Sequence, residues 1–353
     1  MHSSDMRPKR VLYMQTRNLG DAVIGTSLIE TLGRSLEGLK ISVFTRPQFS
    51  EIYERNPFVS EVHYSSFPMG TAKNFSTKAA AHLLFKALEL RRQRFDAVLQ
   101  AVGDFRENFI AWLISPSANV GPVWSEDHPL RELSRPGLVG CIARPMPVSG
   151  TEKNIYDIVF RLAKQVGPVV RGKSRLYDSA GTPFRHDPAS NIIGIHPMAS
   201  QECKLWTADK WRRLVSILRG NGLRVRLFGS VADLLFLRTC VEDVSDPGIE
   251  MITGNLNQFF HGLVDVRALV GLDSFGMHAA YAVGTPVIMI NGGNVPTVWA
   301  PPGTKIISNE TPPPCYPCFN RPTCKNSPNP YHCIRDISVE RVLDVLQEIS
   351  ALS

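Results

Sequence analysis

The stretch Val270-Gly-Leu-Asp-Ser-Phe-Gly-Met-His-Ala279 indicates the fold of this chain. An apolar segment, Ala268 to Leu272, leads into a tight Asp-Ser turn, after which the pattern predicts a helix that begins near Phe275. A second apolar segment, Val287 to Ile290, follows a Gly-Thr-Pro turn. A strand, a small-residue turn and a helix N-terminus bring unpaired backbone N–H groups and the positive end of the helix dipole to one place. The stretch therefore predicts an anion site, with a phosphate-bearing ligand as the first candidate.

The same alternation of apolar strands and amphipathic helices runs through the chain and predicts a doubly wound α/β fold. Residues 66–78 are rich in small and polar residues and are predicted to form a mobile loop. Strands are predicted at residues 11–15, 40–45, 96–102, 192–196, 224–228, 268–272 and 287–290, and helices at residues 21–36, 153–166, 207–219 and 232–240.

A length of 353 residues indicates two domains. The pattern is lost over residues 167–190 and then restarts, so the linker is placed there. The predicted domains are two Rossmann-like halves whose strand ends face one cleft. Neither half carries a G-x-G-x-x-G fingerprint, which argues against a dinucleotide-dependent dehydrogenase. The expected ranges are residues 1–175 for the first domain, residues 190–335 for the second with a cysteine-rich segment at 312–335, and residues 336–353 for a C-terminal helix that packs back across the first domain.

Composition and charge narrow the class of partner. The chain is 43% apolar and 20% charged, which is typical of a soluble globular protein, and its net charge of +7 fits an anionic partner such as a nucleotide, a phosphorylated glycolipid or an acidic membrane surface. No basic stripe with interleaved aromatic residues is present, so nucleic acid is not an expected partner. The N-terminal residues lack the apolar run of a signal peptide. The expected location is the cytoplasm, including the inner face of the inner membrane.

The segment Arg17-Asn-Leu-Gly-Asp-Ala-Val-Ile-Gly-Thr26 joins the first predicted strand to the first helix. Open α/β sheets bind ligands at this end of a strand, and a carboxylate there can accept a proton from a substrate hydroxyl group. Asp21 is thus a candidate general base, and Arg17 and Asn18 are candidate acceptor-binding residues. The alternative is that Asp21 only caps the helix, since aspartate is favoured at helix N-termini.

A second candidate segment runs from Ile195 to Trp206. A predicted strand ends at His196, a polar loop follows, and Lys204 precedes the next helix. Lysine supplies a mobile positive charge that suits a diphosphate. The alternative interpretation of Lys204 is an ordinary solvated lysine.

The opening stretch supplies further candidate ligands of a nucleotide sugar. Asp273 and Ser274 could hydrogen-bond phosphate oxygens or cap the helix, Gly276 lies in the predicted first turn, and His278 is one turn into the helix. Two more candidates, Ser230 and Asp233, follow another predicted strand and could reach a ribose; the alternative is an ordinary strand-to-helix turn.

Four cysteines gather near the C-terminus: Cys315, Cys318, Cys324 and Cys333. Four thiolates at short spacing can hold one tetrahedral ion, which predicts a structural zinc or iron site. The alternative is a set of free or paired thiols in a loop. Because four cysteines would leave no open coordination position, no metal is expected to take part in catalysis.

Taken together, these motifs resemble those of glycosyltransferase family 9, the ADP-heptose:lipopolysaccharide heptosyltransferases. The resemblance rests on Asn18-Leu-Gly-Asp-Ala-Val, His196 with Lys204-x-Trp206, Phe228-Gly-Ser, Gly271-Leu-Asp-Ser-Phe-Gly-Met-His and the later Gly284-Thr-Pro, which occur in the order of the family. The tail also resembles the metal-binding finger of bacterial autotransporter heptosyltransferases, with different spacing. The loop between His196 and Lys204 departs from the family in length and composition.

The resemblance implies a GT-B fold and an inverting transfer of a sugar from a nucleotide-sugar donor, ADP-L-glycero-β-D-manno-heptose. It assigns the general base to Asp21, the diphosphate contact to Lys204 and the nucleotide-sugar motif to Asp273, Ser274 and His278. The expected acceptor is an anionic glycolipid such as the lipopolysaccharide core, or a protein. Three alternatives stay open: transfer of another sugar or to a protein, a sugar-nucleotide epimerase of the same fold, and a non-enzymatic regulator built around the cysteines.

Overall fold

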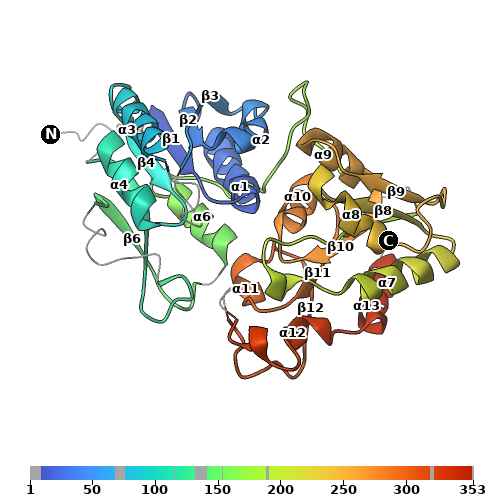
Figure 1. Ribbon diagram of the computed structural model, residues 1–353. Coiled ribbons are helices and arrows are strands. Elements are labelled where there is room, and N and C mark those ends of the chain that lie inside the picture. Colours follow the sequence, from blue (N-terminus) through green and yellow to red (C-terminus); the bar gives the residue numbers. More distant parts are fainter. Residues whose placement is uncertain are drawn as a thin grey trace. The chain divides into compact units, whose positions relative to one another are not determined.

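The computed structural model describes residues 9–67, 76–115, 117–131, 141–152, 154–187, 191–318 and 322–351. The chain divides into two compact units, residues 1–182 and residues 183–353. The first unit is coloured blue to green in Figure 1 and the second yellow-green to red. The division falls inside residues 167–190, where the linker was predicted.

The first unit is built on a parallel sheet with the strand order β3-β2-β1-β4-β5-β6. This order places the first strand beside the fourth, because the chain winds outward in one direction and then in the other. Strands β1 and β4 are buried along almost their whole length, as expected for the centre of a parallel sheet. The strands are β1 Arg10–Gln15, β2 Lys40–Thr45, β3 Val59–Tyr64, β4 Ala97–Gln100, β5 Asn119–Trp124 and β6 Arg144–Val148.

Helices pack together in two groups in the first unit. Helix α1 packs against α6 and α2, whereas α3 packs against α4. Apolar side chains of α3 and α4 form one core with the strands, represented by Leu83 and Ile110 against Leu12 and Val98. The helical elements are α1 Leu19–Ser35, η1 Pro47–Phe49, α2 Ser50–Glu54, α3 Thr77–Arg91, α4 Phe105–Ile114 and α6 Ile155–Ala163.

The second unit repeats this topology. Its parallel sheet has the order β12-β11-β10-β7-β8-β9, so the first strand of this unit, β7, again lies beside the fourth, β10. The strands are β7 Ile192–His196, β8 Arg224–Phe228, β9 Ile249–Ile252, β10 Val266–Leu272, β11 Val287–Asn291 and β12 Lys305–Ser308. The helical elements are η4 Glu202–Lys204, α7 Ala208–Gly220, η5 Val231–Asp233, α8 Leu234–Thr239, α9 Leu256–Val264, α10 Phe275–Val283, α11 Pro296–Trp299, η6 Cys324–Asn326, α12 His332–Arg335 and α13 Val339–Ala351.

The C-terminal helix α13 corrects one expectation. It was predicted to pack back across the first domain, but it packs against α7 and strands β10 to β12 of the second unit. Its buried residues Val339, Val342 and Leu346 lie at helical spacing and join the core that contains Trp206 and Trp211. The apolar face of α13 completes the core of the second unit.

Predicted element boundaries agree with the structure to within a few residues, and the weakest predictions concern the first unit. Residues 68–75 of the predicted mobile loop lie outside the described residues, and its last two residues belong to α3. Strands β3, β5 and β6 of the first unit, and β9 and β12 of the second, were not predicted from the sequence. No residue of strand β3 is fully buried, and β6 contains two prolines, so neither shows a continuous apolar run.

Within the described part of the chain, none of the helices combines the length and the apolar character needed to cross a membrane.

Candidate active site

The strand orders of the two sheets create two switch points, one at the C-terminal ends of β1 and β4 and one at the C-terminal ends of β7 and β10. Neighbouring strands at such a point are followed by chains that leave in opposite directions, which opens a crevice where α/β proteins bind ligands. Asp21 follows β1, and Lys204 and Asp273 follow β7 and β10. The predicted catalytic residues therefore lie at these two places.

Asp21 is held by the residue that begins its own helix. The backbone N–H and the side-chain amide of Asn18 donate to Asp21 Oδ2 over 3.2 and 3.1 Å. Asp21 is only 7% exposed and lies in the first turn of α1, where the helix dipole favours a negative charge. Asp21 therefore does take part in capping helix α1, as the alternative interpretation proposed. This capping fixes the carboxylate at the end of β1 and is compatible with a role as base.

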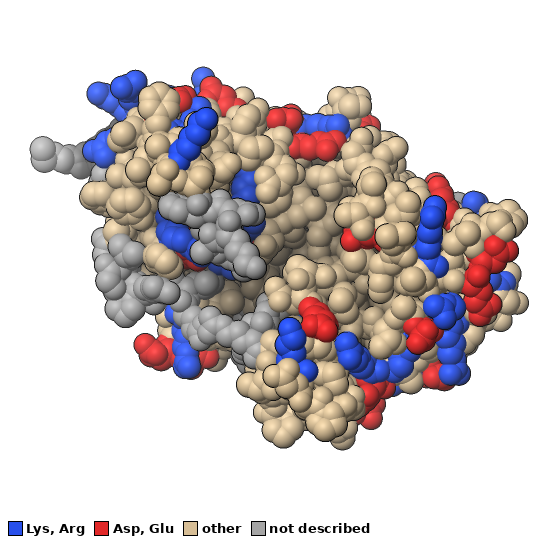
Figure 2. All heavy atoms as spheres, viewed as in Figure 1, with Lys and Arg blue, Asp and Glu red and all other residues tan. Residues whose placement is uncertain are grey.

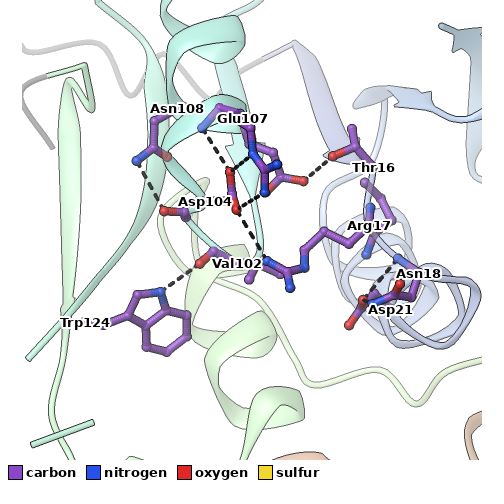
Figure 3. Close-up of polar contacts among 12 residues, drawn as sticks. Thr16, Arg17, Asn18, Asp21, Val102, Asp104, Glu107, Asn108 and Trp124 are labelled. Carbon is purple, nitrogen blue, oxygen red and sulfur yellow. Dashed lines mark hydrogen bonds and ion pairs between the residues drawn. The ribbon is translucent and has the colours of Figure 1, made fainter. Parts of the chain in front are cut away.

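A second polar group meets this loop from β4 and α4 (Figure 3). Asp104 begins α4 and accepts two hydrogen bonds of 2.9 Å from the Arg106 guanidinium. Burial alone would raise the pKa of Asp104, but the bonds from Arg106 outweigh it and lower that pKa. Arg17 reaches toward the same carboxylate from the β1–α1 loop, with Nη1 lying 3.7 Å from Asp104 Oδ2. The predicted acceptor-binding residue Arg17 is therefore placed against α4.

Glu107 is the most unusual residue of this group. It is only 2% exposed, accepts a hydrogen bond from the Thr16 hydroxyl group at Oε1, and has no hydrogen-bond partner at Oε2 among the described residues. Burial raises the pKa of Glu107 to about 7, against the attraction of Arg17 and the bond from Thr16. The carboxyl group consequently exists in both protonation states near neutral pH.

In the second unit, Lys204 and Asp273 form an ion pair. Lys204 Nζ lies 2.9 Å from Asp273 Oδ2, and the two side chains are only 12% and 8% exposed. The side-chain amide of Asn294 also donates to Asp273 Oδ2. Asp273 thus orients Lys204, and this geometry favours that role over the predicted direct bond from Asp273 to a phosphate, which a carboxylate would repel.

The turn before α10 is packed closely against the end of β7. Ser274 is the N-cap of α10, and its hydroxyl group lies 3.2 Å from Nδ1 of His196. Gly276 is buried in the first turn, and a Cβ atom there would lie 2.6 Å from the same ring nitrogen. Only glycine allows the helix N-terminus to approach His196 this closely, so Gly276 shapes the site without a side chain.

The two histidines of this site are uncharged at neutral pH. Burial lowers the pKa of His196 to about 4, with Asp233 opposing it, and burial lowers the pKa of His278 to about 4 as well. Asp273 raises the pKa of His278 and Lys204 lowers it, which places His278 beside the ion pair. Both rings can therefore serve as neutral hydrogen-bonding groups.

Ser230 and Asp233 form a turn of their own at the end of β8. The backbone N–H and hydroxyl group of Ser230 donate to Asp233 Oδ2 over 2.8 and 2.6 Å. This is the strand-to-helix turn of the alternative interpretation, although Ser230 is exposed and Asp233 partly so. A groove of about 870 Å³ begins beside this turn at Val231 and Thr253 and continues along β9 and α9.

The cysteines of the C-terminal segment meet a fifth cysteine, Cys203, which lies far from them in the sequence. Cys203 contacts Cys318, Cys315 contacts Cys324, and burial together with the charges of its neighbours raises the pKa of Cys333 to about 11. Soft sulfur donors suit zinc or iron. However, no three His, Cys, Asp or Glu side chains within the described ranges are arranged to hold a metal ion. The metal site stays a prediction.

On the face drawn in Figure 2, basic and acidic side chains are interspersed. The excess of positive charge in the sequence is therefore not gathered there into one stripe.

A model of glycosyltransferase family 9, described as heptosyltransferase, matches residues 84–328. This range includes β4, α4 and most of the second unit, with both sides of the Lys204–Asp273 pair.

The chain belongs to glycosyltransferase family 9.

Known proteins support this family membership. Lipopolysaccharide heptosyltransferase 3 of Escherichia coli is 23% identical over 303 residues, which is 80% of this chain and 83% of that protein. The E. coli heptosyltransferase WaaC, solved with ADP-2-deoxy-2-fluoro heptose, superposes with a TM-score of 0.74 at 15% identity over 96% of this chain and 99% of WaaC. TibC, an iron-containing dodecameric glycosyltransferase of enterotoxigenic E. coli, gives a TM-score of 0.56 at 16% identity over 98% of this chain and 77% of TibC.

The likeness to the solved structures establishes the fold. This family 9 protein has the GT-B fold of two Rossmann-like domains, as the sequence predicted, and it is a glycosyltransferase.

Three residues of the candidate active site of this family 9 enzyme were not predicted from the sequence: Asn294, Glu107 and Asp104. Asn294 follows β11 and could have been found from the rule that ligands lie at the ends of parallel strands. Glu107 does not follow a strand, but helical spacing gives a signal: it precedes the buried residues Ile110, Ala111 and Ile114 by three, four and seven positions on the same face of α4. Its neighbour Asp104 is an ordinary N-cap in the sequence.

Proposed function

We propose that this family 9 enzyme transfers a heptose from ADP-heptose to an acceptor of the lipopolysaccharide core, with inversion at the anomeric carbon. The observation that carries the proposal is the buried Lys204–Asp273 pair at the N-terminus of α10. It puts a fixed positive charge next to backbone N–H groups at a switch point, which suits a diphosphate leaving group. The family and its relatives supply the sugar and the acceptor.

Lys204 has one N–H group left to hydrogen-bond the nucleotide sugar. An ammonium group has three N–H bonds, and in the described structure one is directed to Asp273 Oδ2 and one, over 3.5 Å, to the Asp273 carbonyl oxygen. The third is available to a diphosphate oxygen. With the α10 N-terminus it stabilises the negative charge that develops as the glycosidic bond to the diphosphate breaks.

Asp21 acts on the acceptor. The hydroxyl oxygen of the acceptor attacks the anomeric carbon, its proton passes to the Asp21 carboxylate, and ADP leaves from the opposite face of the sugar. The ionised state of Asp21 that this step needs is favoured by its place in the first turn of α1 and by the two hydrogen bonds from Asn18. No metal ion is required for this transfer.

A screen of nucleotide sugars tests the donor. ADP-heptose is expected to raise the melting temperature, while GDP- and UDP-sugars are expected to leave it unchanged. A ligand present at 100 times its Kd stabilises a folded protein by about 2.7 kcal/mol, which is easily measured by thermal shift. Transfer of label from ADP-heptose to lipopolysaccharide core acceptors then tests the reaction. Three outcomes would contradict the proposal. Stabilisation by a different nucleotide sugar would indicate another donor, and transfer to protein would indicate a protein acceptor. Product formed without an acceptor would indicate an epimerase.

The acceptor determines where the enzyme works. We propose that it contacts the inner face of the inner membrane, where a glycolipid acceptor presents its sugars. The net charge of +7 favours an anionic surface. Binding to vesicles with anionic lipids that weakens as salt is raised would support this location.

A structural metal held by Cys315, Cys318, Cys324 and Cys333 is a further proposal, supported by the contacts between these thiols. We expect about one zinc or iron per chain in metal analysis of the purified protein. Replacing Cys315 and Cys324 together by serine should remove it and lower the melting temperature. The matched control is Cys240→Ser, because Cys240 is buried and its thiol donates to the Phe236 carbonyl oxygen of α8. Metal-free protein of unchanged stability would exclude the site.

A further inference from the structure

The cluster around Glu107 is larger than the transfer mechanism requires. Besides Asp21, it contains Tyr13 and Arg17 from β1 and its loop, Arg46 after β2, and Asp104 and Arg106 from α4. All of them influence Glu107 or are influenced by it: Arg17, Asp104 and Asp21 shift its pKa, and its own charge shifts the pKa values of Tyr13, Arg46 and Arg106.

The two arginines that lie near Asp104 differ in their hydrogen bonds. Arg106 donates two hydrogen bonds to Asp104. Arg17 Nη1 is buried and lies 3.7 Å from Asp104 Oδ2, but it makes no hydrogen bond with any described residue. Glu107 Oε2 also lacks a hydrogen-bond partner in the described structure. A buried guanidinium N–H without an acceptor costs free energy, so this position favours an anion.

Asp104 already forms an ion pair with Arg17, and two further anions compete for the guanidinium. One is the carboxylate of Glu107, whose pKa Arg17 lowers more than any other group does. The other is an anionic group on a bound substrate, since this switch point lies beside Asp21. Two anions at one guanidinium repel each other in a buried site, so the two occupations exclude one another.

We propose that Glu107 is a proton-linked positioning residue of the acceptor site: when protonated it leaves the guanidinium of Arg17 to a phosphate or carboxylate group of the acceptor, and when ionised it holds that guanidinium itself. The proton that Glu107 loses passes to solvent. The identity of the acceptor rests on the proposed function, whereas the linkage between proton and anion does not.

The sign of the pH dependence follows directly. Below pH 7 Glu107 is mostly neutral and the acceptor binds tightly; above pH 7 the carboxylate forms and the acceptor must displace it. With a pKa of about 7, the acceptor KM should rise up to about tenfold between pH 6 and pH 8. The donor KM should not follow this rise.

The variant Glu107→Gln tests the proposal. Glutamine keeps the oxygen that accepts from Thr16 and places an N–H where the protonated acid has its O–H, so it imitates the neutral form. We expect its acceptor KM at pH 8 to equal that of the wild-type enzyme at pH 6. Arg17→Gln should give the weak affinity at both pH values. Glu89→Gln is the control, because Glu89 lies on α3 of the same unit and is paired with Lys86 at the surface.

A binding experiment separates this inference from the proposed function. Sulfate and acetate keep a constant charge between pH 6 and pH 8 and represent a phosphate and a carboxylate group. We expect their Kd, followed by NMR titration of the enzyme, to rise with pH in the wild type and to stay constant in Glu107→Gln. This result would stand even if no heptose were transferred. A constant Kd in the wild type, or the same rise in Glu107→Gln, would overturn the proposal.

Discussion

Replacing Asp21 by asparagine is expected to abolish nearly all turnover while leaving donor binding intact. The substitution keeps the shape of the side chain and an oxygen that can accept from Asn18, but it removes the group that takes the proton of the acceptor hydroxyl. General bases contribute about 10²–10⁴-fold to rate, so kcat should fall by that order. Steady-state kinetics gives kcat, and calorimetric titration with ADP gives the affinity for nucleotide, which should stay unchanged.

The chain supplies a matched control for the capping role of Asp21. Asn154 and Asp157 repeat, at the start of α6, the spacing of Asn18 and Asp21 at the start of α1. Asp157 is 61% exposed and belongs to the same unit. Asp157→Asn removes an N-terminal carboxylate together with an exposed ion pair to Arg171, so it shows the largest loss of stability expected from such a change outside the active site. If Asp21→Asn kept a kcat near that of Asp157→Asn, Asp21 would be a cap and another residue would be the base.

The second large effect is expected at Lys204. In Lys204→Met the diphosphate loses a fixed positive charge, and kcat should fall about 10²–10³-fold, the usual cost of one preorganised donor. The same change leaves the Asp273 carboxylate buried without its cation. Breaking a buried pair in this way costs about 3–5 kcal/mol, so the free energy of unfolding should fall as well.

A double variant separates the two consequences of this substitution. Lys204→Met combined with Asp273→Asn removes the unpaired charge and keeps a group that can hydrogen-bond Asn294. It should recover most of the stability, measured by urea unfolding, but not the activity or the affinity for ADP. Recovery of activity would mean that Lys204 only neutralises Asp273. The control is Lys305→Met, which breaks an exposed pair with Glu348 in the same unit and should change little.

The sequence revealed those site residues that are both chemically suited to the reaction and placed at a recognisable strand end. Asp21 and Asp273 each follow an apolar run and precede a helical one, so their places at strand ends could be inferred. Lys204 was recognised from its position after β7 and from the family motif. Glu107 does not follow a strand, and its role depends on Thr16 and Arg17, which are far from it in the sequence. Asn294 does follow an apolar run, but its contact with Asp273 is visible only in the structure.

The sequence by itself determined the alternation of strands and helices, the two α/β domains and the family, because hydrophobic periodicity and ordered motifs are local properties. The tertiary structure decided which strands are neighbours. Only the pairing of β1 with β4 brings Arg17 to Asp104, and only the pairing of β7 with β10 brings Lys204 within 2.9 Å of Asp273. Strand order, burial and charge pairing depend on contacts between distant segments, and these contacts set the protonation of Glu107 and the orientation of Lys204.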